Sequence, residues 1–277
     1  MPDQTYIHGF TDAERQRLIR QAELLAPAVI DPLALRGNER LLEIGCGVGA
    51  QIRQLLQRWP TLRIQCIDRS ARHLAAAADH LNAHITAGAV AIAQMDADHL
   101  ALPDNHFDAA LTIWVLEHTD NPAAVLREAW RVLKPGGRLL LNEVNNATLD
   151  ITPDNEPIRH WWDRFNAFQA AGGADPFIGQ RIARLAADAG FTDIASAPLP
   201  AICSRGLTPN QRRTWLRYLR DLLLSGAPAM TLGGYVTAAD QRRLRQAFKQ
   251  LETTPNVAFH YLAARLTASK PTPRAPT

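Results

Sequence analysis

The chain has 277 residues, 21% of them charged, and a formal net charge of +3 at pH 7. That length buries a substantial core but is long for one α/β domain and short for two, so we expect one domain with insertions. The small charge excess argues against a nucleic-acid or membrane-binding surface. The cysteines Cys46, Cys66 and Cys203 are odd in number and unclustered, which suits a reducing cytoplasm and offers no metal-ligand spacing.

The N-terminal segment predicts a helix. Met1–Phe10 lacks the apolar stretch of a signal peptide, and no apolar run has transmembrane length, which favours a cytoplasmic location. Thr11–Glu14 has the pattern of a capping box, and apolar residues at helical spacing continue from there to Pro27. Because this helix precedes the first core strand, we expect it at the edge of the sheet or over the carboxyl ends of the strands.

Residues 41–50 read Leu-Leu-Glu-Ile-Gly-Cys-Gly-Val-Gly-Ala, an apolar strand that stops at three glycines. Behind them, Gln51–Trp59 has the apolar spacing of a helix. Gly45, Gly47 and Gly49 let the backbone turn tightly and approach a ligand without a Cβ in the way. The helix start directs free N–H groups at an anionic group. Strand, glycine turn and helix in this order predict a site for a phosphate- or nucleoside-sized ligand.

Two kinds of ligand fit this glycine pattern. Gly45-x-Gly47-x-x-Ala50 matches the dinucleotide fingerprint, with Asp68 as the acidic residue about twenty positions on. Glu43, however, ends the strand two residues before the first glycine, where a carboxylate repels a pyrophosphate and attracts an ammonium or sulfonium group. The sign of this charge argues against NAD. A glycine-rich turn without any ligand is the structural alternative.

The next elements alternate between strand and helix, which is the pattern of a parallel sheet. Asp68 ends the second strand, where ligands of open parallel sheets bind, although it could instead cap the helix that follows. Lys134–Gly137 is expected to end the helix before it, because glycine supplies left-handed dihedrals and proline cannot continue a helix. The expected strands are Arg63–Ile67, Val90–Gln94, Phe107–Ile113 and Arg138–Val144, and the expected helices are Ser70–Leu81 and Pro122–Leu133.

The second half contains two expected helical insertions, residues 145–178 and 206–251. The aromatic-rich segment His160–Phe168 either roofs a substrate pocket or forms the core face of its own helix. The arginine-rich face of a helix at Thr208–Leu224 is expected to be solvated rather than to bind nucleic acid. The other expected elements are helices at Phe177–Gly190 and Thr237–Leu251, a sixth strand at Asp193–Pro198, a seventh, antiparallel strand at Phe259–Ser269, and a disordered tail at 270–277.

Five segments in order carry a resemblance to a known family. They are Glu43–Gly49, Cys66–Ser70, Asp96-Ala97, Phe107-Asp108 with Trp114–His118, and Leu133–Gly137. These segments resemble the motifs of the class I (Rossmann-like) S-adenosylmethionine-dependent methyltransferases of the small-molecule type. The resemblance covers residues 41–144 densely and 181–194 loosely, and five ordered segments are more specific than one glycine motif.

The resemblance implies an α/β fold with a doubly wound, mostly parallel seven-stranded sheet and helices on both faces. It also implies that residues 1–277 form a single methyltransferase domain. Within it, residues 1–36 would carry a lid helix, residues 37–144 would bind the cofactor, and the two helical insertions would cap the pocket.

The implied cofactor is S-adenosylmethionine. Glu43 would hold its amino group, the backbone of Gly45–Gly49 its methionine portion, and Asp68 both ribose hydroxyls. Asp96 would accept from the adenine amino group, and the backbone N–H of Ala97 would meet the ring. The full set of implied cofactor contacts is Glu43, Gly45, Cys46, Gly47, Gly49, Asp68, Arg69, Asp96, Ala97, Ile113 and Trp114.

The implied reaction is methyl transfer to an N, O or C atom of a small-molecule acceptor by in-line displacement. If the acceptor is a hydroxyl or an ammonium, His118 or Glu143 is placed to take its proton, whereas a free amine or thiolate needs no base. No metal, nucleic-acid or membrane partner is expected. The expected substrate contacts are Tyr6, Phe10, His118, Trp161 and Trp162.

Two other uses of this fold stay open. The cofactor could be held without methyl transfer, as in a pericyclase or a binding module. A protein or RNA methyltransferase predicts an open groove with a basic rim, which the even charge balance disfavours.

Overall fold

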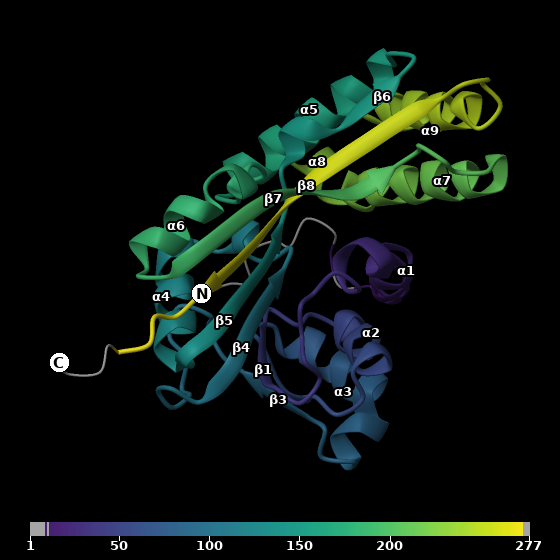
Figure 1. Ribbon diagram of the computed structural model, residues 1–277. Coiled ribbons are helices and arrows are strands. Elements are labelled where there is room, and N and C mark those ends of the chain that lie inside the picture. Colours follow the sequence, from purple (N-terminus) through teal and green to yellow (C-terminus); the bar gives the residue numbers. More distant parts are fainter. Residues whose placement is uncertain (1–8, 10, 274–277) are drawn as a thin grey trace.

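The computed structural model describes residue 9 and residues 11–273 (Figure 1). Within these ranges a central sheet carries helices on both faces, which is the α/β arrangement that the sequence predicts. Tyr6 and Phe10, the expected lid contacts, and residues 274–277 of the expected tail lie outside the described residues.

Among residues 9 and 11–273 the sheet has eight strands, one more than the sequence predicts. Its order is β3-β2-β1-β4-β5-β8-β6, and β7 also pairs with β8. The pairs among β1 to β5 are parallel, and every pair that includes β8 is antiparallel. The additional strand is β6, whose three residues are too few to show an alternating pattern. The bounds are β1 Arg40–Ile44, β2 Arg63–Asp68, β3 Val90–Gln94, β4 Phe107–Ile113, β5 Leu133–Glu143, β6 Asp150–Thr152, β7 Thr192–Cys203 and β8 Ala258–Ser269.

Alternation along β1 sends neighbouring side chains to opposite faces of the sheet. Leu41 packs in a core cluster with residues of α1, α2 and α3, whereas Leu42 packs in a second cluster with residues of α4 and α6. Figure 1 shows α2 and α3 on one side of the sheet and α4 and α6 on the other. These helices are α1 Asp12–Val29, α2 Ala50–Arg58, α3 Ala71–Thr86, α4 Pro122–Val132 and α6 Ile182–Asp188.

Four further helices lie along β8 in the upper half of Figure 1. They come from the two expected insertions, and α9 packs against both α5 and α7. The short helix α8 was not predicted from the sequence. The bounds are α5 Glu156–Ala171, α7 Pro209–Ser225, α8 Ala227–Leu232 and α9 Ala238–Leu251.

Helix α1 continues past Pro27, where the sequence predicts its end. A proline inside a helix removes one backbone hydrogen bond, but only two residues of α1 follow it. The carbonyls of Ala28 and Val29 then accept from the guanidinium of Arg265, at 2.6 and 3.2 Å. A basic side chain at a helix carboxyl end also complements the helix dipole, so a residue of β8 stabilises the end of α1.

Helix α4 ends before Lys134–Gly137, as expected, but these residues already belong to β5, which starts at Leu133 and not at Arg138. Gly136 has a positive φ of 76°, as a glycine at a tight bend permits. The Gly136 N–H donates to the Lys270 carbonyl at 2.8 Å, and the Lys270 N–H donates to the Gly137 carbonyl at 2.8 Å. This reciprocal pair joins Gly136 and Gly137 to the sheet, ahead of the predicted strand start at Arg138.

Lys270 was predicted to begin a disordered tail, and the structure corrects that prediction. The residue is 5% exposed. Its ammonium donates to the Leu133 carbonyl and to Asn105 Oδ1, each at 2.8 Å, and lies 4.0 Å from the centroid of the Trp130 ring. The side chain caps the carboxyl end of α4, and the folded chain therefore extends past β8.

Candidate functional site

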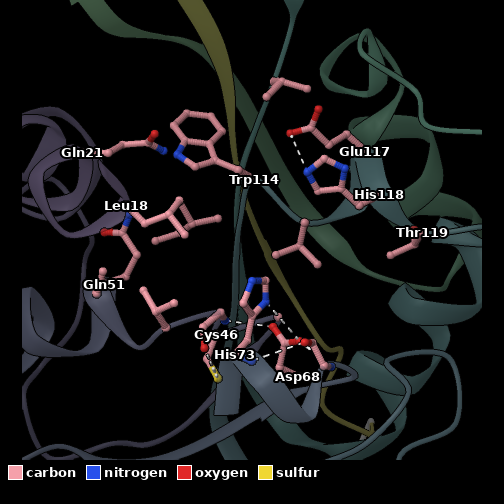
Figure 2. Close-up of a pocket in the computed structure, with 18 of the residues that line it drawn as sticks. Leu18, Gln21, Cys46, Gln51, Asp68, His73, Trp114, Glu117, His118 and Thr119 are labelled. Carbon is pink, nitrogen blue, oxygen red and sulfur yellow. Dashed lines mark hydrogen bonds and ion pairs between the residues drawn. The ribbon is translucent and has the colours of Figure 1, made fainter. Parts of the chain in front are cut away.

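A cavity of about 1120 Å³ opens at the carboxyl ends of β1, β2 and β4. Ligands of open parallel sheets bind at this position, because helix starts and strand-end loops converge there. We call the lining residues between 43 and 99 the strand-end part. We call Glu117, His118 and the lining residues between 144 and 261 the helical part. Figure 2 shows residues from both, with α1 contributing Leu18 and Gln21 on one side.

The glycine loop between β1 and α2 has three left-handed residues. The φ angles of Gly45, Gly47 and Gly49 are 72°, 54° and 73°. A Cβ on Gly45 would lie 2.6 Å from Val115, and one on Gly49 would lie 2.6 Å from Leu81. A Cβ on Gly47 would meet nothing within 4 Å. Gly45 and Gly47 line the cavity, whereas Gly49 does not. Gly49 instead lets α2 pack closely on α3.

Glu43 places a carboxylate at the floor of the strand-end part. The residue is 2% exposed, and its Oε2 has no hydrogen-bond partner among the described residues. Burial, and then the negative charge of Asp68, raises the pKa of Glu43 to about 8. An orphaned buried oxygen costs free energy unless a ligand supplies the donor, so this site suits a cationic or hydrogen-bond-donating group.

Asp68 ends β2 and fixes the shape of the glycine loop. Its Oδ2 accepts from the Gly47 N–H at 2.9 Å, and its Oδ1 accepts from the Ser70 N–H at 2.8 Å. Burial opposes its ionisation, but the hydrogen bonds from His73, Ser70 and Gly47 outweigh burial and lower the pKa of Asp68. Ser70, not Asp68, is the N-terminal cap of α3. Asp68 is thus an ionised, fixed acceptor at the cavity wall.

The other expected cofactor contacts mostly reach the same cavity. Trp114, which follows β4, has a positive φ of 59°, and its indole N–H has no hydrogen-bond partner among the described residues. A bulky residue in this conformation is strained, which is a frequent property of ligand sites. The remaining expected contacts in the lining are Cys46, Arg69, Asp96, Ala97 and Ile113.

Glu143 does not line the cavity, although the sequence makes it a candidate base. It is fully buried, and its carboxylate accepts from the Thr112 hydroxyl at 2.6 Å and from the N–H groups of Val115 and Leu116 at 3.1 Å. Burial raises its pKa to about 7 against these hydrogen bonds. Glu143 holds the loop after β4 and has no path to a substrate in this arrangement.

The two tryptophans of α5 that were expected to contact the substrate lie in different environments. Trp161 is fully buried, donates to the Leu223 carbonyl at 3.1 Å and is absent from the cavity lining. Trp162 lines the cavity, donates to the Asn146 carbonyl at 2.9 Å and stacks on Phe165 with ring centroids 5.5 Å apart. Trp161 belongs to the hydrophobic core and Trp162 to the cavity wall, because adjacent helix positions point about 100° apart.

His118 lines the helical part, as expected, and has a neighbour that the sequence did not single out. Its Nε2 lies 3.5 Å from Oε1 of Glu117 (Figure 2). Burial, and then the charge of Arg69, lowers the pKa of His118. Burial, and then the charge of Glu143, raises the pKa of Glu117 to about 8. The pair is therefore set to be neutral near pH 7.

Sequence reasoning missed several lining residues, among them Glu117, Asn146, Gln169 and Tyr261. Glu117 stands inside the quoted motif Trp114–His118, so its position was the available signal. Asn146, Gln169 and Tyr261 belong to segments that meet only in the folded chain, and no local pattern identifies them.

Among the described residues no group of three or more His, Cys, Asp or Glu side chains could hold a metal ion. No helix in that part of the chain is both long and apolar enough to span a membrane.

Comparison with known proteins agrees with this geometry. Residues 42–141 match the methyltransferase domain family. The chain is 34% identical over 176 residues, 63% of its length and 49% of the relative's, to an uncharacterized 37.1 kDa protein of a Streptomyces fradiae transposon. It is 33% identical over 123 residues, 44% of its length and 48% of the relative's, to the ubiquinone/menaquinone biosynthesis C-methyltransferase UbiE of Pseudomonas aeruginosa. The chain spans about half the length of the curated relatives it matches.

Two solved structures share the fold. One is the [4+2]-cyclase SpnF, with a TM-score of 0.56 and 23% identity over 92% of this chain and 82% of that one. The other is a phosphoethanolamine N-methyltransferase of Haemonchus contortus in complex with S-adenosylhomocysteine, with a TM-score of 0.56 and 19% identity over 91% of this chain and 53% of that one. Together with the domain match, these likenesses support the α/β fold that the motifs imply. The domain match is confined to residues 42–141, and the two solved structures extend the likeness of fold to 92% and 91% of the chain.

Proposed function

We propose that this protein transfers the methyl group of S-adenosylmethionine to a small-molecule acceptor. The observation that carries the proposal is the orphaned carboxylate oxygen of Glu43, buried at the floor of a cavity beside the glycine loop. A cofactor with an ammonium and a sulfonium group satisfies that oxygen and favours the ionised carboxylate, whereas the ionised carboxylate would repel a pyrophosphate.

The cofactor's parts match the chemistry along the strand-end part. Glu43 faces the amino group, and the open side of Gly47 leaves room for the methionine portion. Asp68, ionised and fixed by two backbone N–H groups, accepts from the ribose hydroxyls. Asp96 and Ala97 lie at the next strand end, where they meet the adenine. Arg69, Ile113 and Trp114 complete the wall around it.

The acceptor enters the helical part of the same cavity. Methyl transfer moves a carbon from a sulfonium to a nucleophile in line, with a neutral thioether as the leaving group. The protein therefore contributes alignment and exclusion of water more than covalent chemistry, and alignment supplies up to about 7–11 kcal/mol. The two helical insertions enclose this part of the cavity, which favours a small molecule over a protein or RNA chain.

Calorimetry with S-adenosylmethionine tests the proposal. We expect binding by the unaltered protein and a loss of about 10- to 100-fold in affinity for Asp68→Ala, because a hydrogen bond to a charged group contributes about 1.5–3 kcal/mol. Asp79→Asn, which neutralises an exposed acid on α3, is the matched control and should leave affinity unchanged. No binding by the unaltered protein, or equal affinities in both variants, would remove the cofactor from the proposal.

A second candidate is a use of the bound cofactor without methyl transfer. The fold shared with a [4+2]-cyclase favours it. Label from the S-methyl group appearing in the product supports methyl transfer, and product formation without label supports the second candidate.

A further inference from the structure

Buried polar atoms without hydrogen-bond partners gather around one side of the cavity. Glu43, Gln51 and Trp114 all line it, and each carries one such atom, with partners sought among the described residues. Glu43 Oε2 and Gln51 Oε1 accept hydrogen bonds, whereas the indole Nε1–H of Trp114 donates one. Since buried polar atoms are nearly always paired in native proteins, these three atoms indicate a ligand that offers donors as well as an acceptor.

The pairing of β1 with β4 places Trp114 beside the glycine loop. Ile44 pairs with Thr112, so Trp114 leaves β4 two residues beyond the pair that directly follows Glu43. The Trp114 N–H donates to the Asn142 carbonyl at 2.9 Å, which fixes the backbone in its strained conformation with positive φ. Neighbouring strands lie about 4.8 Å apart. The indole donor and the Glu43 acceptor therefore come from adjacent strand ends at one edge of the sheet.

A second donor comes from α1. Gln21 lines the cavity, and its Oε1 accepts from Nη1 of Arg17 at 2.6 Å. The opposite orientation of the amide would set its N–H groups against the donor of Arg17, so the amide nitrogen faces away from Arg17. Figure 2 shows this nitrogen pointing toward the indole nitrogen of Trp114. Arg17, whose guanidinium pairs with Glu14 at 2.6 and 2.7 Å, also polarises the amide and strengthens its N–H donors.

This arrangement of donors and acceptors matches the two charged groups of an α-amino acid. An ammonium group supplies donors to Glu43 and Gln51, and a carboxylate accepts from Trp114 and Gln21. The pyrophosphate of a dinucleotide offers acceptors only, so it would leave Glu43 and Gln51 unpaired. Both groups of an α-amino acid are attached to one carbon, as the donors and acceptors of adjacent strand ends require.

We propose that the indole N–H of Trp114 and the side-chain amide of Gln21 bind the carboxylate at the amino-acid end of the cofactor, while Glu43 binds its ammonium group. The inference rests on the proposed function and adds to it the residues that recognise this carboxylate. Because Gln21 belongs to α1, the bound carboxylate links α1 to the end of β4. A nucleoside that lacks the carboxylate cannot make this link.

The experiment compares two ligands that differ only in the carboxylate. S-adenosylhomocysteine has it, and the decarboxylated analogue keeps the adenosine, the thioether and the amino group. Calorimetry measures the affinity of both ligands for the unaltered protein and two variants. Trp114→Phe removes the indole N–H and keeps an aromatic ring, and Gln21→Glu keeps an oxygen for Arg17 but replaces the donor with a carboxylate. Trp59→Phe, at the carboxyl cap of α2 and outside the cavity lining, is the matched control.

The quantity that decides is the ratio of the two affinities, because a general effect of a substitution on the cavity cancels in it. We expect the unaltered protein to bind S-adenosylhomocysteine about tenfold or more tightly than the analogue, since hydrogen bonds to a charged group are lost with the carboxylate. Trp114→Phe should reduce the ratio about tenfold, and Gln21→Glu should reduce it further, because like charges repel. Trp59→Phe should leave the ratio unchanged.

The outcomes separate this inference from the proposed function. No binding of either ligand by the unaltered protein would contradict the proposed function itself. Equal affinities of the unaltered protein for both ligands, or an unchanged ratio in Trp114→Phe and Gln21→Glu, would overturn the carboxylate site alone. A changed ratio in one variant only would remove the other residue from the site. Binding of the decarboxylated analogue shows that a variant is folded, and if Trp114→Phe fails this check, the ratio for Gln21→Glu decides.

Discussion

Glu43 shows how a single buried side chain couples ligand binding to pH. In the free protein, burial and Asp68 keep its pKa near 8, so the group is largely protonated at pH 7. A bound ammonium or sulfonium favours the ionised form and lowers that pKa. Binding of the cofactor must then release a proton from Glu43.

This linkage gives a prediction with a definite sign. Because the raised pKa belongs to the free protein, affinity for S-adenosylmethionine should rise with pH, by up to about tenfold per unit, and level off above about pH 8. Glu43→Gln should bind more weakly and with no such slope. Calorimetry in buffers of different ionisation enthalpy measures the released proton directly. A flat pH profile for the unaltered protein would show that Glu43 does not face the cation.

At the scale of elements, the β1–α2 turn divides its glycines between two tasks. Gly49 lets α2 approach α3, since a Cβ there would lie 2.6 Å from Leu81. Gly47 has open space around its missing Cβ and lines the cavity. Both have positive φ, so an alanine at either position carries a backbone cost of about 1–2 kcal/mol.

We therefore predict opposite patterns for two matched variants. Gly49→Ala should lower the free energy of unfolding by about 2–4 kcal/mol, because overpacking adds to the backbone cost. Gly47→Ala should lose only about 1–2 kcal/mol but should weaken cofactor binding more, because its methyl group enters the cavity. Urea unfolding and calorimetry on both variants provide the comparison. Equal losses of stability in the two variants would contradict the assignment of packing to Gly49 and of ligand approach to Gly47.

The elements that the sequence predicted are those with a strong local pattern. Five of the seven expected strands appear within one residue of their predicted bounds. The fifth begins five residues early, at Leu133, and the sixth ends five residues late, at Cys203. β6 and α8 were missed because three and six residues are too few to establish a period. Lys134–Gly137 has turn residues, but its backbone pairs with Lys270, a long-range contact that overrides the local preference.

The same distinction holds for the site. The glycines and acidic residues at the strand ends can be predicted from local sequence, and most of the residues predicted in this way line the cavity. The direction in which a side chain points at a strand end does not follow: Glu143 turns away to hold Val115 and Leu116. Tyr261 and Gln169 meet Glu117 only through the packing of β8 and α5, so no pattern within either segment could have indicated them.

At the scale of the whole molecule, the cofactor half and the helical half share one core. The same cluster of buried residues contains Leu41 of β1, Trp161 of α5, Leu244 of α9 and Phe259 of β8. The cavity lies between these elements, so its walls exist only when both halves are folded. We infer that the chain unfolds as one cooperative unit, as a single domain would.

Trp161 tests that inference because it is fully buried in the helical half and far from the glycine loop in sequence. Trp161→Ala should cost about 3–5 kcal/mol through the cavity it leaves and the unpaired Leu223 carbonyl. Loss of helical circular dichroism and loss of S-adenosylmethionine binding should still coincide at one, lower urea midpoint. Leu232→Ala, at a residue 91% exposed on α8, should change the free energy of unfolding by no more than about 0.5 kcal/mol. If Trp161→Ala instead melts the helices first and retains cofactor binding, the two halves are separate folding units, because a shared core cannot lose one side and keep the other.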